Sequence, residues 1–82
     1  MQVVHNTFDG PMTNISAFSM DIKEPSKAND LHGALSAFPH KVVFTPGGGV
    51  SNGSVCMAYV SKANDAEAKT IFASNGFKTA AV

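Results

Sequence analysis

Three histidines, His5, His32 and His40, are the side chains of this sequence best suited to acid–base or metal chemistry. Zinc sites recur at short ligand spacings, such as two histidines four residues apart on one helix face. No two of these histidines have that spacing, and no cysteine or carboxylate accompanies them at a ligand-like spacing. We therefore expect exposed or hydrogen-bonded histidines, with no metal site and no cofactor.

Cys56 and a glycine-rich segment are the other candidates for chemistry. Cys56 is the only cysteine and stands in an apolar run, where a small buried thiol is expected rather than a nucleophile. Gly47, Gly48 and Gly49 lack the Lys-Ser/Thr pair that completes a phosphate-binding loop, and they precede a strand rather than a helix. We expect no catalytic residue, and we interpret these glycines, together with Asn52, as a hairpin loop able to contact a partner.

Hydrophobic patterning predicts the strands that position these residues. A short strand is expected within residues 1–8, and period-two alternation predicts another over residues 14–22. Apolar runs predict three further strands, over residues 40–45, 54–60 and 77–82.

The pentapeptide Ser-Lys-Ala-Asn-Asp occurs twice, at residues 26–30 and 61–65, and each copy is expected to open a helix. In the first copy, Ser26 and Asn29 are candidate N-caps, and Pro39 is expected to stop the helix. Its predicted apolar stripe consists of Leu31, Ala34, Leu35 and Phe38.

The second helix carries signals at both ends. Asn64 and Glu67 have the spacing of a capping box, and Gly76 is expected to end the helix. Phe77 then stands where a Schellman cap would bring it against Phe72. The predicted apolar ridge of this helix consists of Ala68, Ile71 and Phe72.

From residue 13 onward, the predicted order is strand, helix, strand, strand, helix, strand, which is the ferredoxin-like pattern. Right-handed crossovers place both helices on one face of an antiparallel sheet. We therefore predict an α+β, ferredoxin-like βαββαβ sandwich, a single domain over residues 1–82 in which residues 1–12 add a strand and a turn. This added strand has three places open to it: a sheet edge, the open face, or a second subunit. The two pentapeptides would mark equivalent strand-to-helix corners, with a remote duplication left open.

Residues 52–76, NGSVCMAYVSKANDAEAKTIFASNG, resemble the third strand and second helix of an RNA-recognition motif domain. The resemblance is carried by the NDAEA segment and the final Asn-Gly, and it implies a ferredoxin-like fold with two base-stacking aromatic residues on the strand. Ser54 and Cys56 stand at those two positions, and Tyr59 stands at an aromatic position that usually belongs to the core. The sheet therefore lacks the stacking aromatics of the family.

Charge and composition separate the classes of partner. Six Lys plus Arg balance six Asp plus Glu, and 15% of residues are charged. Nucleic-acid-binding domains normally carry a basic excess, so nucleic acid is disfavoured. The low charged fraction favours contact with another protein or with a second copy as a homodimer. The sequence shows no signal-peptide pattern and no apolar stretch of transmembrane length, so we expect a cytoplasmic protein with no membrane contact.

The open face of the predicted sheet is the candidate interaction face. Met57 and Tyr59 are assigned to the helix-covered side of their strand, which leaves the alternate residues on the open side. The predicted open face consists of Ala17, Ser19, Val43, Thr45, Cys56, Ala58, Val60, Thr79 and Ala81. These side chains are small and uncharged, as expected for a contact surface.

These observations favour a small non-enzymatic protein-interaction module that acts through the sheet face or an edge strand. Its size fits an accessory protein of a phage or mobile element that binds or inhibits a host protein. Two alternative classes are an RNA-recognition-motif-like nucleic-acid-binding domain and a small dimeric ferredoxin-like-barrel enzyme. The enzyme would use His32 or His40 in a pocket between the sheet and the helices.

Overall fold

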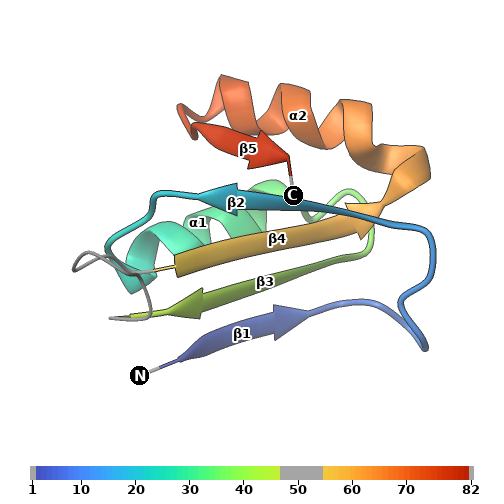
Figure 1. Ribbon diagram of the computed structural model, residues 1–82, viewed down its shortest axis with the longest axis horizontal. Coiled ribbons are helices and arrows are strands. Elements are labelled where there is room, and N and C mark those ends of the chain that lie inside the picture. Colours follow the sequence, from blue (N-terminus) through green and yellow to red (C-terminus); the bar gives the residue numbers. More distant parts are fainter. Residues whose placement is uncertain (1, 47–54, 82) are drawn as a thin grey trace.

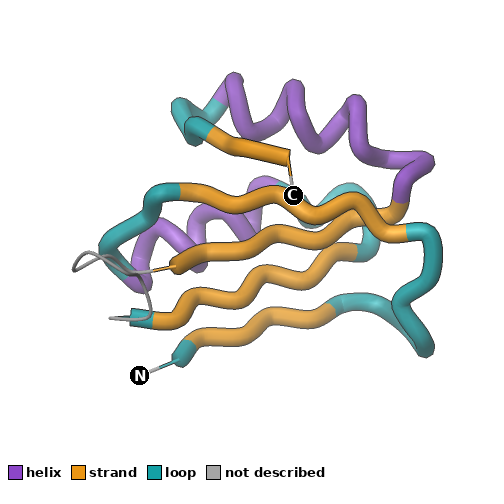
Figure 2. The backbone as a smooth tube through the Cα atoms, viewed as in Figure 1, coloured by secondary structure: helices purple, strands orange, loops and turns teal. Residues whose placement is uncertain are grey.

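The computed structural model describes residues 2–46 and 55–81. A five-stranded antiparallel sheet, with strand order β1-β3-β4-β2-β5, packs against two helices (Figures 1 and 2). The strands are β1 Val3–Asn6, β2 Ile15–Met20, β3 His40–Thr45, β4 Val55–Ser61 and β5 Thr79–Ala81. The helices are α1 Pro25–Ala34, the short 3₁₀ helix η1 Lys62–Asn64 and α2 Asp65–Ser74. The predicted ferredoxin-like βαββαβ sandwich with an added N-terminal strand is confirmed.

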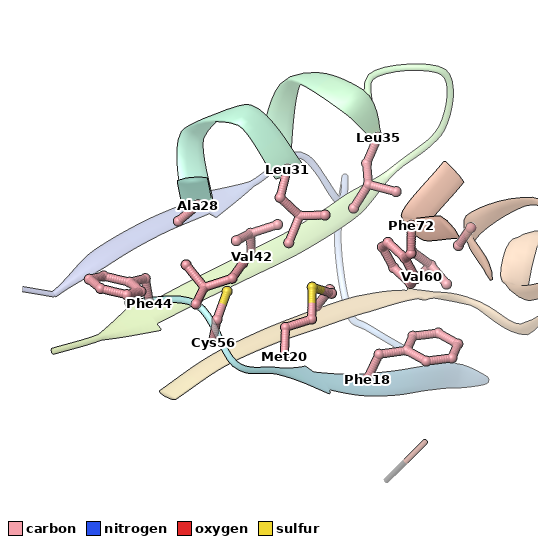
Figure 3. Packing of buried hydrophobic residues seen from close by; sticks show 13 residues of the cluster. Phe18, Met20, Ala28, Leu31, Leu35, Val42, Phe44, Cys56, Val60 and Phe72 are labelled. Carbon is pink, nitrogen blue, oxygen red and sulfur yellow. The ribbon is translucent and has the colours of Figure 1, made fainter. Parts of the chain in front are cut away.

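One apolar core lies between the sheet and the helices, as Figure 3 shows from close by. The sheet contributes Phe18, Met20, Val42 and Phe44, the helices contribute Ala28, Leu31, Ala68 and Phe72, and Leu35 adds to the core from the position directly after α1. The Phe18 ring meets the Phe72 ring edge to face, with ring centroids 5.2 Å apart. Because residues of both helices belong to this single cluster, both helices cover the same face of the sheet.

The prediction was wrong about which face of β4 is buried. Cys56, Ala58 and Val60 are each 0% exposed and lie under the helices, so Met57 and Tyr59 occupy the open side. The register gives the reason. Cys56 stands between Phe44 and Met20, and Ala58 stands between Val42 and Phe18. Large side chains from the flanking strands fill the space beneath the helices, so the middle strand has room there only for small ones.

The start of α1 also differs from the prediction. The helix begins at Pro25, one residue after its N-cap Glu24, which makes no side-chain cap hydrogen bond. Proline suits this first position because its missing N–H would be unbonded there and its φ is already helical. Ser26 and Asn29 therefore lie inside the helix, and their expected N-cap roles are wrong. The helix ends at Ala34, and a turn separates it from Pro39.

The two pentapeptides do not occupy equivalent positions. The first lies within α1, whereas the second runs from the last residue of β4 through η1 to the first residue of α2. Equivalent elements are 40 residues apart, since β4 begins 40 residues after β2 (55 − 15) and α2 begins 40 residues after α1 (65 − 25). The pentapeptides are 35 residues apart (61 − 26), so the repeat is five residues out of structural register.

The end of α2 is a Schellman motif, as predicted. The Phe77 N–H donates to the Phe72 carbonyl at 2.9 Å, and the Gly76 N–H donates to the Ala73 carbonyl at 3.1 Å. Gly76 has φ of +78°, a left-handed conformation that glycine adopts without strain. At the other end of α2, the expected capping box is wrong, because the N-cap Asn64 makes no side-chain cap bond. Instead, the acidic side chains of Asp65 and Glu67 in the first turn interact favourably with the positive end of the helix dipole.

β1 extends the edge of the sheet beside β3. Its register pairs Val3 with Phe44 and Asn6 with Lys41, and Figure 1 shows it as the outermost strand, at the bottom of the view. Of the three places left open for the N-terminal strand, the structure selects the edge and leaves the open face uncovered by β1. Among the described residues, no helix is long and apolar enough to span a membrane.

Candidate functional site

The helix-free face of the sheet carries an uncharged row of side chains that crosses all five strands. The register aligns Val4, Val43, Met57, Ser19 and Ala80 side by side. Opposed residues of antiparallel strands point to the same face, so these five side chains share the open side. We call this set the open row.

A second row lies next to it and is more polar. It consists of Asn6, Lys41, Tyr59 and Ala17, aligned across β1, β3, β4 and β2. Lys41 is the single charged residue of the two rows. In the described sheet the open side is therefore almost uncharged and is formed mainly by small or medium-sized side chains, with Tyr59 as its largest.

Five of the nine residues predicted for the open face are misplaced. Ala17, Ser19, Val43 and Thr45 lie on the open side as predicted. Cys56, Ala58 and Val60 are buried in the core. Thr79 and Ala81 pair with Met20 and Phe18, so they share the helix-covered side, and Ala80 takes their place on the open face. The predicted contact residues Gly47, Gly48, Gly49 and Asn52 lie outside the described residues.

The placement of Cys56 and Tyr59 bears directly on the resemblance to RNA-recognition motifs. Cys56 aligns with a base-stacking position of that family but is buried, and Tyr59 aligns with a core position but lies on the open face. The strand thus presents the opposite set of side chains to solvent. The other aligned stacking position, Ser54, lies outside the described residues.

The three histidines form a cluster that the sequence did not predict. The rings of His5 and His32 stack with centroids 4.0 Å apart and an interplanar angle of 2°. The His32 Nδ1 atom lies 2.7 Å from the His40 Nε2 atom. One histidine comes from β1, one from α1 and one from β3, so this histidine cluster connects three elements that are distant in sequence.

His40 fixes the proton positions in the cluster. It is 1% exposed, and its Nδ1 atom lies 2.9 Å from the Phe38 carbonyl oxygen. A carbonyl only accepts, so Nδ1 of His40 carries a proton and donates. In the neutral ring Nε2 then holds a lone pair, and His32 donates to it from Nδ1. The Thr7 hydroxyl adds two bonds, accepting from the His40 backbone N–H at 2.9 Å and donating to the His40 carbonyl at 3.2 Å.

The same reasoning fixes the position of the proton on His5. Its Nε2 atom lies 2.7 Å from the Asn29 amide oxygen, so Nε2 carries the proton and donates. The nitrogens left with lone pairs are Nδ1 of His5 and Nε2 of His32. Protons added there would charge the two stacked rings without breaking any bond of the cluster. Burial lowers the pKa of His32, and nearby positive charge on His5 and then on His40 lowers it further.

This geometry links the three rings by stacking and by one hydrogen bond, and it does not assemble a metal site. Stacked, parallel rings direct their lone pairs along parallel planes rather than to one point, and the 2.7 Å His32–His40 contact leaves no space for an ion. Within residues 2–46 and 55–81, no group of three or more His, Cys, Asp or Glu residues is arranged to hold a metal.

The alternative function as a small enzyme requires a pocket, between the sheet and the helices, that contains His32 or His40. Both side chains line an open surface depression of about 410 Å³, together with Thr7, Ser36, Ala37, Phe38 and Pro39. His40 is almost fully buried at its base, and its ring nitrogens are engaged by Phe38 and His32. The pair can share a proton, but it lies in an open hollow rather than in a closed apolar pocket.

Cys56 is a buried side chain of the core, as predicted. Its side chain lies under the helices, and burial raises the pKa of its thiol to about 11 (Figure 3). The thiolate is the reactive form, so this cysteine is poorly suited to act as a nucleophile at neutral pH.

No protein-family model, no curated protein and no solved structure matches this chain. Its function is therefore inferred from the open face of the sheet, the sheet edges and the histidine cluster.

Proposed function

We propose that this protein is a small, non-enzymatic protein-interaction module that binds through the open face of its sheet. The observation that carries the proposal is the open row, an uncharged line of side chains that runs from one sheet edge to the other on the side without helices. In a small domain, an extended uncharged face is a common site of protein contact.

Two properties of the face support a protein rather than a small molecule as the ligand. Sheet order and register place the row on a broad surface that spans all five strands, whereas small-molecule sites are concave. The face also carries a single charge, Lys41, in its two rows. Charged residues are depleted at the centres of protein interfaces, where desolvating them is unfavourable.

A charge placed at the centre of the row tests the proposal. Met57→Lys introduces a charge on the middle strand, and Ala66→Lys introduces the same charge on an exposed position of α2. Self-association and capture of other proteins should both be measured for the two variants and the wild type. Met57→Lys is expected to weaken every contact made by the face, whereas Ala66→Lys leaves it unchanged.

The proposal fails if Met57→Lys and Ala66→Lys bind as the wild type does while both variants remain folded. Circular dichroism and thermal melts establish the folding. Because the side chain of Met57 is only partly buried and points away from the core, the substitution leaves the packing between sheet and helices intact.

A second candidate, nucleic-acid binding, rests on one observation. Tyr59 and Lys41 are directly opposed on neighbouring strands of the open face, which puts one aromatic ring beside one cation. Stacking on an aromatic ring contributes about 1–3 kcal/mol per base, so a single ring supports weak binding at most. Single-stranded RNA should be titrated at low salt against the wild type and Tyr59→Ala. RNA binding that requires Tyr59 would favour this candidate, and absence of binding at low salt would remove it.

A further inference from the structure

One side of the β1 backbone has no strand beside it in the described structure. β1 is the outermost strand and pairs only with β3 (Figure 1). Directly after β1, the Thr7 N–H donates to the His40 carbonyl at 2.9 Å. Bonded and non-bonded pairs alternate along an antiparallel ladder, so Val3 and His5 also bond toward β3. The N–H and C=O groups of Val4 and Asn6 therefore point outward, away from the sheet.

This free edge carries none of the residues that usually protect an edge strand. Natural edges are shielded by lysine or other charges, by proline, by bulges or by very short strands. Residues 2–8, QVVHNTF, contain no lysine, no acidic residue and no proline. β1 and β5 are both short, with four and three residues, but at the opposite edge Lys78 stands directly before β5.

The side chain of Val4 adds an apolar contact to this edge. The Val4 side chain is 49% exposed, and among the described residues it is the one large hydrophobic residue that is exposed. Val4 also ends the open row, beside Val43. A further strand placed against β1 would cover Val4 and extend the row beyond the present edge.

The edge is held in shape before any partner arrives. On the helix side, His5 donates to Asn29 and stacks on His32. On the open side, the Gln2 amide donates to the Thr45 hydroxyl at 3.3 Å. A strand fixed in this way loses little conformational freedom on binding, and this preorganisation raises affinity.

We infer that a second copy of the chain pairs with this edge, β1 against β1, in antiparallel orientation about a two-fold axis beside His5. Val4 of one copy then faces Asn6 of the second copy, and the two residues exchange both backbone hydrogen bonds. The symmetry repeats this pair, which gives four bonds, and His5 faces His5. The two five-stranded sheets join into one sheet with a continuous open face. This inference goes beyond the proposed function, because it uses the edge of the sheet rather than its open face.

The occupant is a second copy because the pattern is self-complementary. Two outward donors and two outward acceptors on one short strand match an identical strand in antiparallel register, and the two-fold contact closes on itself. The zero net charge produces no overall repulsion between copies. A chain of 82 residues also buries a modest core, so association adds buried surface that the fold lacks alone.

The two ends of the open row provide a matched pair of test variants. Val4→Lys and Ala80→Lys place the same charge on the two opposite edges of the sheet. Light scattering and sedimentation over a wide protein concentration range give the dimer dissociation constant for each. We expect a wild-type dimer that Val4→Lys weakens by about tenfold or more, since a lysine on the edge opposes strand addition. Ala80→Lys should leave the constant unchanged.

Two further variants test the register itself. Val4→Pro removes an N–H that points away from β3, so the monomer keeps its ladder while the dimer loses two of its four bonds, one from each copy. With Cys56→Ala in the background, His5→Cys should form a disulfide between copies, because residues opposed across an antiparallel pair lie within disulfide reach. Asn6→Cys, which would face Val4, should not.

A wild-type monomer at all concentrations overturns the inference. So does a dimer weakened equally by Val4→Lys and Ala80→Lys, or one that forms no His5→Cys disulfide. A dimer lost in Met57→Lys but kept in Val4→Pro would mean that the sheet faces meet, so the proposed function stands and the edge inference falls. Binding of an unrelated protein in place of a second copy, again lost in Met57→Lys, likewise keeps the proposed function and overturns the edge inference. A chain that binds nothing through either surface overturns both.

Discussion

Acidification should destabilise this protein through the histidine cluster, and the geometry gives the size of the effect. The three histidines of the cluster are all the histidines of the chain. Histidine is the side-chain type whose ordinary pKa lies closest to the window between pH 7 and 5, and burial raises the pKa of the Cys56 thiol to about 11, far outside it. Any loss of stability in this window therefore reports on these three rings.

The direction in which stability changes with pH follows from the lowered pKa of His32. In the unfolded chain His32 titrates near its ordinary value of 6.5, whereas the folded protein accepts the proton only at lower pH. Between those two pKa values the unfolded state binds more protons, so the free energy of unfolding falls as pH falls. The stabilisation is complete above about pH 6.5 and is lost progressively below it.

Repulsion between the stacked His5 and His32 rings sets the size of this loss of stability. Two unit charges 4.0 Å apart, the separation of the His5 and His32 centroids, repel by about 1 kcal/mol in water and about 4 kcal/mol at the effective dielectric near a protein surface. Both rings are partly exposed, so the lower half of this interval applies. A loss of about 1–2 kcal/mol between pH 7 and 5 lowers the midpoint of thermal unfolding by at least about 4 °C in a domain of this size.

Urea denaturation at a series of pH values measures this loss. His5→Phe keeps an aromatic ring against His32 but cannot be charged, so its unfolding free energy should vary less with pH than that of the wild type. Asn29→Ala removes the hydrogen bond to His5 and keeps all three histidines, so it should lower stability while keeping the pH slope. A wild-type free energy that is constant from pH 7 to 5, or an unchanged slope in His5→Phe, would refute the reasoning.

Two further predictions concern the core and the helix cap. Gly76→Ala places a side chain at φ of +78° and should destabilise the protein by about 1–2 kcal/mol, measured by urea denaturation, whereas Ser74→Ala on the last turn of α2 should have little effect. Cys56 should react with a thiol reagent at pH 8 far more slowly in the folded protein than in urea, because its thiol is buried and its pKa is about 11; equal rates would contradict its burial.

The sequence predicted the fold well because its elements had strong local signals. Alternation in β2 placed Ala17 and Ser19 correctly on the open face, and the Gly76–Phe77 pair marked the Schellman end of α2. In β4 both alternating sets are apolar, so periodicity could not tell the faces apart. The smaller set is buried because of the large residues on β2 and β3, and strand neighbours become known only with the register.

The histidine cluster was beyond the reach of sequence reasoning for a related reason. His5 lies on a strand whose position was left open, and His32 lies on a helix whose start was misplaced. The cluster exists because β1 lies beside β3 and under α1, which is a property of the tertiary arrangement. No pattern in the sequence indicates the cluster, because even the Thr7 hydroxyl that bonds to the His40 backbone is 33 residues away from it.

The position of β1 at the edge of the sheet leads us to expect that this strand opens separately from the rest of the domain. β1 and β2 are consecutive in the chain, yet β3 and β4 lie between them, so residues 7–14 must cross past two strands to join them. No side chain of β1 is fully buried, and a complete βαββαβ core remains when this strand is taken away. Such a segment opens with less free energy than global unfolding requires. Native-state hydrogen exchange should therefore show the amides of β1 exchanging through a local opening, while those of β4 exchange only when the whole domain unfolds.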